Sequence, residues 1–95
     1  MLICKVIGNV WATKKDPPLE GKKLMVVQQT DAHGEDSVGE SFVAADIVGA
    51  GIGERVLVVS GSTARQALGS NEMPIDAAIV GIIDSLEVDR VKYEF

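Results

Sequence analysis

Apolar and polar positions alternate at the start of the chain, which is typical of a β-strand. Between Leu2 and Thr13, every second residue is apolar or small on one face, so that face should point into a core. The other face is less regular, because Ile3, Ile7 and Trp11 interrupt its polar residues. Gly8, in the middle of the run, predicts a bend or bulge where the strand curls around a small barrel.

The hydrophobic pattern predicts four more strands, over Leu24–Gln29, Ser41–Ala45, Arg55–Val59 and Ala77–Ile83. The last strand has apolar residues on both faces and continues its pattern through Leu86 and Val88, with Gly81 as a second point of curling. Two loops are expected between the strands. They are a polar, proline-containing loop at Lys14–Lys23 and an acidic turn or loop at Thr30–Glu40.

A short helix should connect the fourth and fifth strands. Ser60–Ser62 turns the chain, and Thr63 and Gln66 have the spacing of a capping box for a helix near Thr63–Leu68. Gly69 can end this helix. Five strands with one small helix between strands four and five predict an all-β fold, a closed or partly open barrel of the OB type.

Composition narrows the class of protein. The 95 residues are 46% hydrophobic and 24% charged, which fits one small globular domain over residues 1–95. A net charge of −5 argues against the basic surface with which nucleic-acid binders neutralise phosphates. Cys4 is the only cysteine, so no internal disulfide can form. With no signal-peptide layout and no apolar run of membrane-spanning length, we expect a soluble, cytoplasmic protein without membrane or nucleic-acid partners.

The strands carry more apolar residues than one barrel interior can hold. Met25–Val27, Leu57–Val59 and Ile79–Ile83 place bulky side chains on both faces. Large contiguous apolar patches are unusual on a monomer, and a symmetric partner is the usual cover for them. The pattern therefore predicts a homo-oligomer.

Gly49, Gly51 and Gly53 fall at every second position just before the fourth strand. Glycine reaches positive φ freely and lets another backbone approach closely, so these residues predict a sharp, tightly packed turn. A phosphate-binding loop is the alternative. Such loops precede a helix and follow GxGxxG or GK[ST] patterns, whereas these glycines precede a strand.

No combination of residues assembles a catalytic or metal site. His33, the only histidine, lies in an acidic segment whose spacing matches no calcium or zinc motif. Cys4 falls on the apolar face of the first strand, where a buried structural thiol is expected. Asp76 and Asp84 flank the last strand but are only two of fourteen acids. We expect no enzyme activity, no cofactor and no bound metal.

The OB fold itself suggests an alternative function, a module that binds single-stranded nucleic acid. Such modules stack bases on aromatic platforms beside a basic groove. This chain has only Trp11, Phe42, Tyr93 and Phe95 as aromatic residues, and its net charge is acidic. The alternative is therefore weaker than its fold suggests, and a small enzyme is weaker still.

Two long stretches of the sequence resemble one family of shell proteins. DIVGAGIGERVLVVSGSTAR (Asp46–Arg65) followed by PIDAAIVGIID (Pro74–Asp84) is similar to the pentameric vertex proteins of bacterial microcompartments, the EutN/CcmL family. MLICKVIGNVWATKK (Met1–Lys15) resembles the first strand of that family. The resemblance covers nearly the whole chain in order, except for the two loops.

The resemblance implies a five-stranded OB-like barrel that assembles into a homopentamer. Pentamers of this family fill the five-fold corners of a polyhedral shell, of metabolosome or carboxysome type, that encloses a metabolic pathway in the cytoplasm. Hexameric shell proteins of a different fold tile the facets. The implied function is structural: the chain closes the shell, with a narrow axial opening at most and without catalysis.

By position, we assign the subunit interface or axial opening to two segments. Small residues let the backbones of two subunits meet closely, and Glu54 and Arg65 are available for pairing across the boundary. A solvated Arg65 is the alternative. The assigned residues are Gly49, Gly51, Gly53 and Glu54 in the glycine turn, and Ser60, Gly61, Ser62, Ala64 and Arg65 after the fourth strand.

Overall fold

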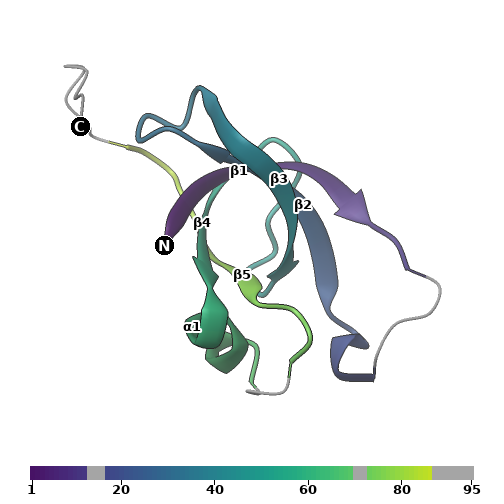
Figure 1. Cartoon of the computed structure of the whole chain (residues 1–95). Coiled ribbons are helices and arrows are strands. Elements are labelled where there is room, and N and C mark those ends of the chain that lie inside the picture. Colours follow the sequence, from purple (N-terminus) through teal and green to yellow (C-terminus); the bar gives the residue numbers. More distant parts are fainter. Residues whose placement is uncertain (13–16, 70–72, 87–95) are drawn as a thin grey trace.

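The chain forms five strands and one α-helix in the computed structural model, which describes residues 1–12, 17–69 and 73–86. In chain order the elements are β1 (Leu2–Val10), a 3-10 turn (Pro17–Leu19), β2 (Lys23–Thr30), β3 (Ser37–Asp46), β4 (Arg55–Ser60), α1 (Gly61–Ala67) and β5 (Ala77–Ile82). The strands close into a barrel in the order β1-β2-β3-β5-β4, which Figure 1 shows end-on. The predicted all-β, closed five-stranded barrel with one helix between strands four and five is confirmed.

Inward-facing side chains of all five strands fill the barrel. Cys4 and Val6 of β1 are fully buried there, which confirms the predicted inward face of the first strand as far as Val6. Beyond Val6 the prediction is wrong, because the register shifts at Ile7, Val10 packs with Leu24 outside the interior and Ala12 is exposed. Removing one such aliphatic side chain from water stabilises the fold by about 1.5–3 kcal/mol. The interior cluster consists of Cys4, Val6, Met25, Val27, Ala44, Ala50, Val56, Val58, Ala77 and Ile79, with Leu2 and Phe42 packed against it.

Bulges beside Gly8 and Gly81 let the strands curl. Val6 pairs with Val27 and Gly8 pairs with Val26, so Ile7 is an extra residue in β1. The bulge predicted at Gly8 is therefore confirmed. Beside Gly81 a second irregularity separates two pairs of β4 and β5, Leu57 with Gly81 and Val58 with Ile79, where the sequence predicts the second curling point. Such bulges increase the local twist that a small closed barrel requires.

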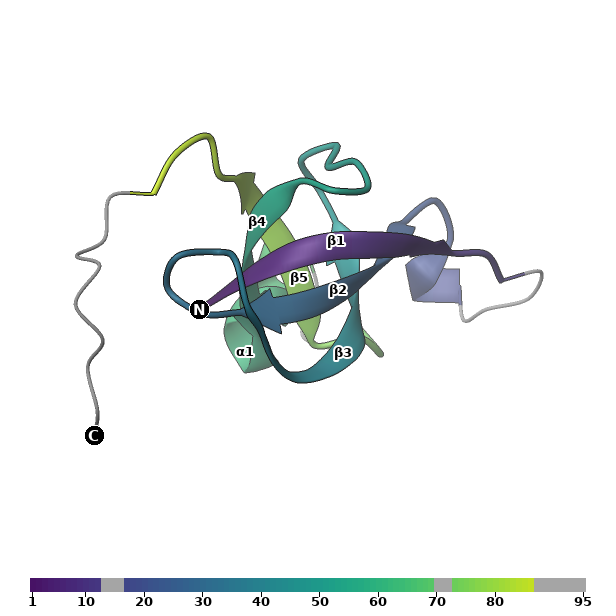
Figure 2. The ribbon, with the colours of Figure 1, turned by 90° about the horizontal axis from the view of Figure 1, so that it is seen from above.

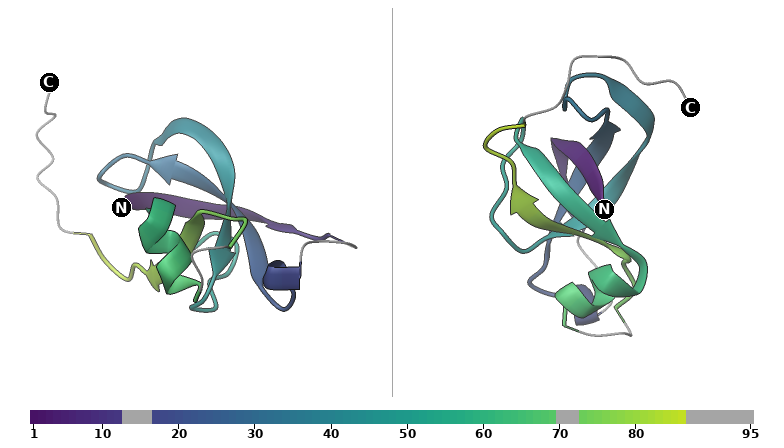
Figure 3. Two further views of the ribbon diagram at one scale, coloured as in Figure 1. Left: turned by 60° about the horizontal axis from the view of Figure 1, so that its bottom comes forward. Right: turned by 90° about the vertical axis from the view of Figure 1, so that its left-hand side faces the viewer.

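The helix α1 covers part of the outer surface of the barrel, as both views in Figure 3 show. Beneath it, one outward side chain from each of four strands forms a second buried cluster with Ala64, Leu68 and Met73 of the α1 region. The four are Leu24, Ala45, Val59 and Ala78. The chain thus covers some of the apolar surplus itself, which the sequence pattern assigned to a partner. Other apolar side chains stay exposed, among them Ile7, Trp11, Val43, Ile47 and Ile52.

Several predicted boundaries are wrong. β1 ends at Val10 because its last pairing partner is Leu24, near the start of β2, and the strand does not reach Trp11. β3 begins at Ser37, four residues before the predicted start, because the acidic turn is tighter than expected. β5 ends at Ile82 and does not continue to Leu86; Val88 lies outside the described residues.

The predicted capping box is also wrong. The helix begins at Gly61, and its N-cap is Ser60, which makes no side-chain capping hydrogen bond. The amide of Gly61 donates to the carbonyl of Asp76 at 2.9 Å, so the segment that precedes β5 satisfies the first amide of the helix. Gly69 does end the helix as predicted, with φ of 95° and its amide on the carbonyl of Gln66.

Burial in the barrel raises the pKa of the Cys4 thiol from 9.0 to about 11, because a thiolate there would lose its hydration. The unfolded chain ionises this thiol first, so stability should be unaffected below about pH 9 and should fall as the pH rises towards 11. Urea unfolding across this range should show a smaller decline for Cys4→Ala than for the unmodified chain. Near pH 8, Ellman's reagent should react with Cys4 only after unfolding, and rapid reaction of the folded chain would contradict its burial.

Candidate subunit interface

The glycine turn between β3 and β4 is built around the carboxylate of Asp46. One oxygen, Oδ1, accepts the amides of Val48 at 2.9 Å and Gly49 at 3.1 Å, and Oδ2 accepts the amide of Ala50 at 2.8 Å. The Asp46 side chain is 0% exposed, and the Lys23 ammonium lies 3.9 Å from Oδ2. A buried carboxylate is tolerated only when hydrogen bonds and an opposite charge replace its hydration. The buried Asp46 side chain therefore holds the first half of the turn in one conformation.

The second half of the turn is fastened to β1. The Gly53 amide donates to the carbonyl of Val6 at 2.8 Å, and the Val6 amide donates to the carbonyl of Glu54 at 3.0 Å. The Glu54 side chain accepts the amide of Gly51 at 2.6 Å. Gly49 and Gly53 have φ of 82° and 93°, so both need glycine for conformation, as predicted. Gly51 does not.

The glycine turn presents apolar side chains to the surface. Ala50 points into the barrel interior and is fully buried. Its neighbours point the other way: Ile47, Val48 and Ile52 are 47%, 38% and 62% exposed. A rigid segment that exposes apolar side chains is typical of a surface that binds another protein.

The residues after β4 form a second, separate surface. Ser60 and Ser62 are exposed, and Arg65 is half-buried. Ala64, however, lies on the face of α1 that packs against the barrel of its own subunit, and it is fully buried there. The glycine turn precedes β4 and α1 follows it, so the two predicted segments lie at opposite ends of this strand, roughly 20 Å apart. Figure 2 shows this separation, with the turn above the barrel and α1 below it.

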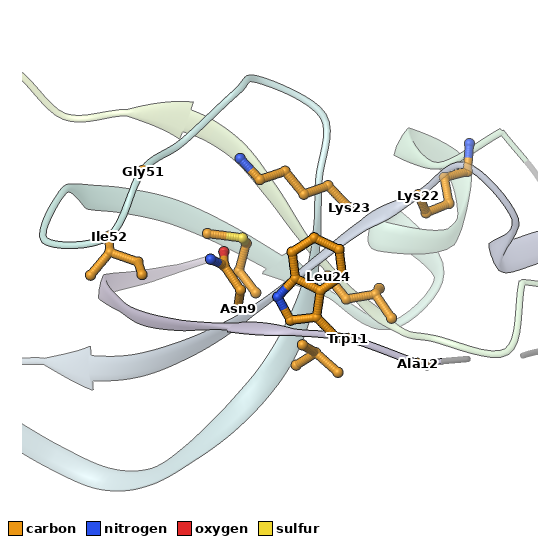
Figure 4. Close-up of a pocket in the computed structure, with 10 residues that line it drawn as sticks. Asn9, Trp11, Ala12, Lys22, Lys23, Leu24, Gly51 and Ile52 are labelled. Carbon is orange, nitrogen blue, oxygen red and sulfur yellow. The ribbon is translucent and has the colours of Figure 1, made fainter. Parts of the chain in front are cut away.

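A pocket of about 630 Å³ lies beside the glycine turn. Asn9, Val10 and Trp11 at the end of β1, Lys22 and Lys23 at the start of β2, and Ile52 of the turn line it. Trp11 is 91% exposed, and Figure 4 shows Ile52 and Lys22 on opposite sides of its indole. The sequence pattern places Trp11 on the polar face of its strand, and nothing in that pattern connects Trp11 with Ile52 or the lysines. Three separate segments meet here, which no local pattern reveals.

The acidic turn around His33 is stabilised by the side chain of Asp31. Asp31 Oδ1 accepts the amides of His33 and Glu35, each at 3.1 Å. The hydrogen bond from Glu35 is the main reason why the pKa of Asp31 is lowered. The His33 imidazole lies 4.0 Å from Asp31 Oδ2, and Arg55 Nη1 donates to the His33 carbonyl at 3.3 Å.

The described part of the chain brings no further chemical groups together. Within residues 1–12, 17–69 and 73–86, no three His, Cys, Asp or Glu side chains are placed to hold a metal ion. Asp76 and Asp84 are exposed beyond the two ends of β5. No helix in these ranges is long and apolar enough to cross a membrane.

Comparison with known proteins identifies related chains. The family model described as "Ethanolamine utilisation protein EutN/carboxysome" matches residues 1–84. The carboxysome shell vertex protein CcmL of Nostoc sp. strain PCC 7120 is 47% identical over 94 residues, which cover 98% of this chain and 93% of that protein. Relatives of this kind give no support to the nucleic-acid-binding alternative.

Solved structures agree with these sequence matches. An ethanolamine utilization protein EutN is 40% identical with a TM-score of 0.87, and the match covers 93% of this chain and 91% of that one. The pentameric microcompartment shell protein GrpN from Rhodospirillum rubrum is 44% identical with a TM-score of 0.82, covering 93% of this chain and all of GrpN. The fold of this chain is thus similar to that of both proteins over nearly its whole length.

Replacing Asp46 with asparagine should loosen the glycine turn, because an amide nitrogen cannot accept the backbone amides that one carboxylate oxygen binds. We expect Asp46→Asn to lower the free energy of unfolding by about 2–4 kcal/mol. Hydrogen exchange at the amides of Val48, Gly49 and Ala50 should accelerate, as NMR would measure. The matched variant Asp84→Asn, at an exposed acid, should stay within about 0.5 kcal/mol of the original. Unchanged exchange in Asp46→Asn would contradict this account.

Proposed function

The chain belongs to the EutN/CcmL family of microcompartment shell proteins, and on that premise we propose that it forms homopentamers that close the five-fold vertices of a polyhedral shell. The shell would be of carboxysome or metabolosome type and lie in the cytoplasm. The observation that carries this proposal is the match of nearly the whole barrel to relatives named as shell vertex proteins, one of them a solved pentamer. The role is structural and requires no catalysis.

A cyclic pentamer needs two different surfaces on each subunit. Neighbours in such a ring meet head to tail, so one surface of a subunit contacts the other surface of the next. The glycine turn and the α1 region satisfy this requirement, because β4 holds them apart within one subunit. We assign Gly49, Gly51, Gly53 and Glu54 to one surface and Ser60, Gly61, Ser62 and Arg65 to the other. Ala64 supports the second surface from below.

The exposed apolar residues of the turn support this assignment. Ile47, Val48 and Ile52 would be covered in a ring, and burying each would contribute up to about 1.5–3 kcal/mol. The turn is already fixed by Asp46 and Glu54, so association costs little loop ordering. The same two segments are the candidates for lining a narrow axial opening in the ring.

Native mass spectrometry of the purified chain tests the proposal directly. We expect a single assembly with five times the 10.1 kDa mass of one chain. A stable monomer would contradict both the pentamer and the need to cover the apolar surface. A closed ring of another size would contradict the five-fold vertex.

Gly51 offers a variant that separates assembly from folding. Its φ is not in the left-handed region, and an added Cβ would meet only the Glu54 carboxylate, at 3.2 Å. Gly51→Trp should therefore fold but fail to assemble, because the indole keeps the neighbouring subunit away. Gly51→Ala is the matched control and should retain the ring. Normal pentamers from Gly51→Trp would remove this residue from the interface, and circular dichroism checks that both variants fold.

We further propose that the pentamer contacts hexameric shell proteins at the facets. Shells produced from hexameric proteins alone should remain open at their corners, and adding this chain should close them. Electron microscopy of both preparations measures the fraction of closed polyhedra. Equal closure with and without the chain would contradict the vertex role.

A further inference from the structure

The pocket beside Trp11 has a complementary segment at the other end of the same subunit. We propose that the β3 bulge at Val38 of one subunit docks into the Trp11 pocket of a second copy of this chain. Asp36 and Glu40 of the bulge would then face the Lys22 side of the neighbour's pocket, beside Lys23, which also compensates its own Asp46. This inference rests on the proposed pentamer and extends its two surfaces: the Trp11 pocket adjoins the glycine turn, and the Val38 bulge would act together with the α1 region.

The pocket has the features of a protein-binding surface. Trp11 and Ile52 are 91% and 62% exposed and give the pocket two apolar side chains from different segments. Exposed tryptophan beside a pocket is among the commonest anchors of protein interfaces. The pocket is also rigid, since Lys23 Nζ donates to the Ala50 carbonyl at 3.2 Å and Gly51 is held by Glu54. Little ordering would be needed when a partner enters.

The Val38 bulge is equally well fixed. Ser41 pairs with Gln28 and Ser37 pairs with Thr30, so residues 38–40 lie opposite a single residue of β2. Gly39 turns this bulge with φ of 67°. The Gln28 side-chain amide donates to the carbonyls of Val38 at 3.0 Å and Gly39 at 3.1 Å. Val38 is thereby held at the surface with 39% of its area exposed.

Charge complementarity selects the occupant. Asp36 and Glu40 are exposed and stand two residues before and after Val38, so an apolar side chain lies between two acids. In the pocket, the apolar Trp11 and Ile52 lie beside two lysines. The acids and the lysines attract one another and orient the approach of two subunits. A like-charged partner would be repelled from the pocket.

The two surfaces also have the right placement for a ring. Lys22 and Lys23 lie at the start of β2, and the bulge lies beside its end, so eight residues of strand, roughly 27 Å, separate them. Figure 2 shows the β2–β3 turn and the end of β1 at opposite ends of the molecule. One subunit therefore cannot fill its own pocket, whereas head-to-tail contact between copies can.

A matched pair of substitutions tests the apolar anchor. Val38 and Val43 both lie in β3 and are 39% and 38% exposed, but Val43 is outside the bulge and is flanked by Phe42 and Ala44. Val38→Lys places a positive charge against the pocket lysines and should weaken assembly at least tenfold, measured as the concentration at which half the chains are pentameric. Val43→Lys should change that concentration less than threefold. Equal effects of the two variants would overturn the proposal.

Charge exchange tests the pairing itself. Glu40→Lys and Lys22→Glu should each weaken assembly and reduce its salt dependence, and the double variant should restore both towards the original values. Mixing the two single variants should rescue less completely than the double variant. Alternating chains satisfy every contact only in a ring with an even number of subunits, and five is odd. Double variants no better than the single ones would overturn the pairing.

These results are distinguishable from failure of the vertex assignment. If the unmodified chain is not pentameric, the proposed function fails before any variant is compared. If it is pentameric and the Val38, Glu40 and Lys22 variants all assemble normally, a second copy does not fill the Trp11 pocket, and only the present inference is overturned. Thermal unfolding of each variant confirms that the barrel is intact.

Discussion

The buried carboxylate of Asp46 is the interaction on which the rest of the structure depends. Asp46 is the last residue of β3 and pairs there with Lys23 of β2 on one side and Ile79 of β5 on the other. Its side chain then binds three successive amides of the glycine turn. A charged group without water must be neutralised by its surroundings, so these partners hold one another in place. Asp46 thus contributes both to the pairing of strands that closes the barrel and to the conformation of the glycine turn.

This arrangement explains why the two faces of the glycine turn differ. The hydrogen bonds of Asp46 and the contact of Gly53 with Val6 pull Ala50 into the barrel, where it closes one end of the interior. Val48 and Ile52, two residues before and after Ala50, stay outside instead. Exposed apolar side chains are unfavourable on an isolated chain, and they are useful on a subunit that will be covered. The same few hydrogen bonds, those of Asp46 and Gly53, therefore bury Ala50 in the core and hold the apolar side chains of the turn at the surface.

The sequence was most informative where a local pattern decides the structure. Alternation identified the first strand and apolar runs identified the others. Gly8 and Gly81 marked the bulges, because a strand that must curl needs a position without a bulky side chain. The helix start was predicted wrongly. The capping-box spacing of Thr63 and Gln66 competes with a hydrogen bond that the Gly61 amide donates to the carbonyl of Asp76, fifteen residues later. Such tertiary contacts easily override the local sequence preference for where a helix begins.

The candidate site was predictable only in part, for the same reason. Glycine spacing correctly indicated positive φ at Gly49 and Gly53. No local pattern indicated that Asp46 organises the turn or that the Ala64 side chain packs inside its own subunit. The Trp11 pocket joins three segments that barrel closure brings together, and the Val38 bulge depends on the register of β2 with β3. Pairing register and closure are properties of the whole sheet, so residues that depend on them become visible only in three dimensions.

A vertex imposes a physical demand that this small barrel can meet. Five subunits must meet at one fixed angle, and an error in that angle is repeated at every boundary of the ring. Flexible loops would leave the angle poorly defined and would add an ordering cost to each contact. Here the exposed turn is held by Asp46 and Glu54 and the bulge by Gln28, so both surfaces are fixed before subunits meet. Rigidity of the single chain is therefore what allows a ring to have a defined shape.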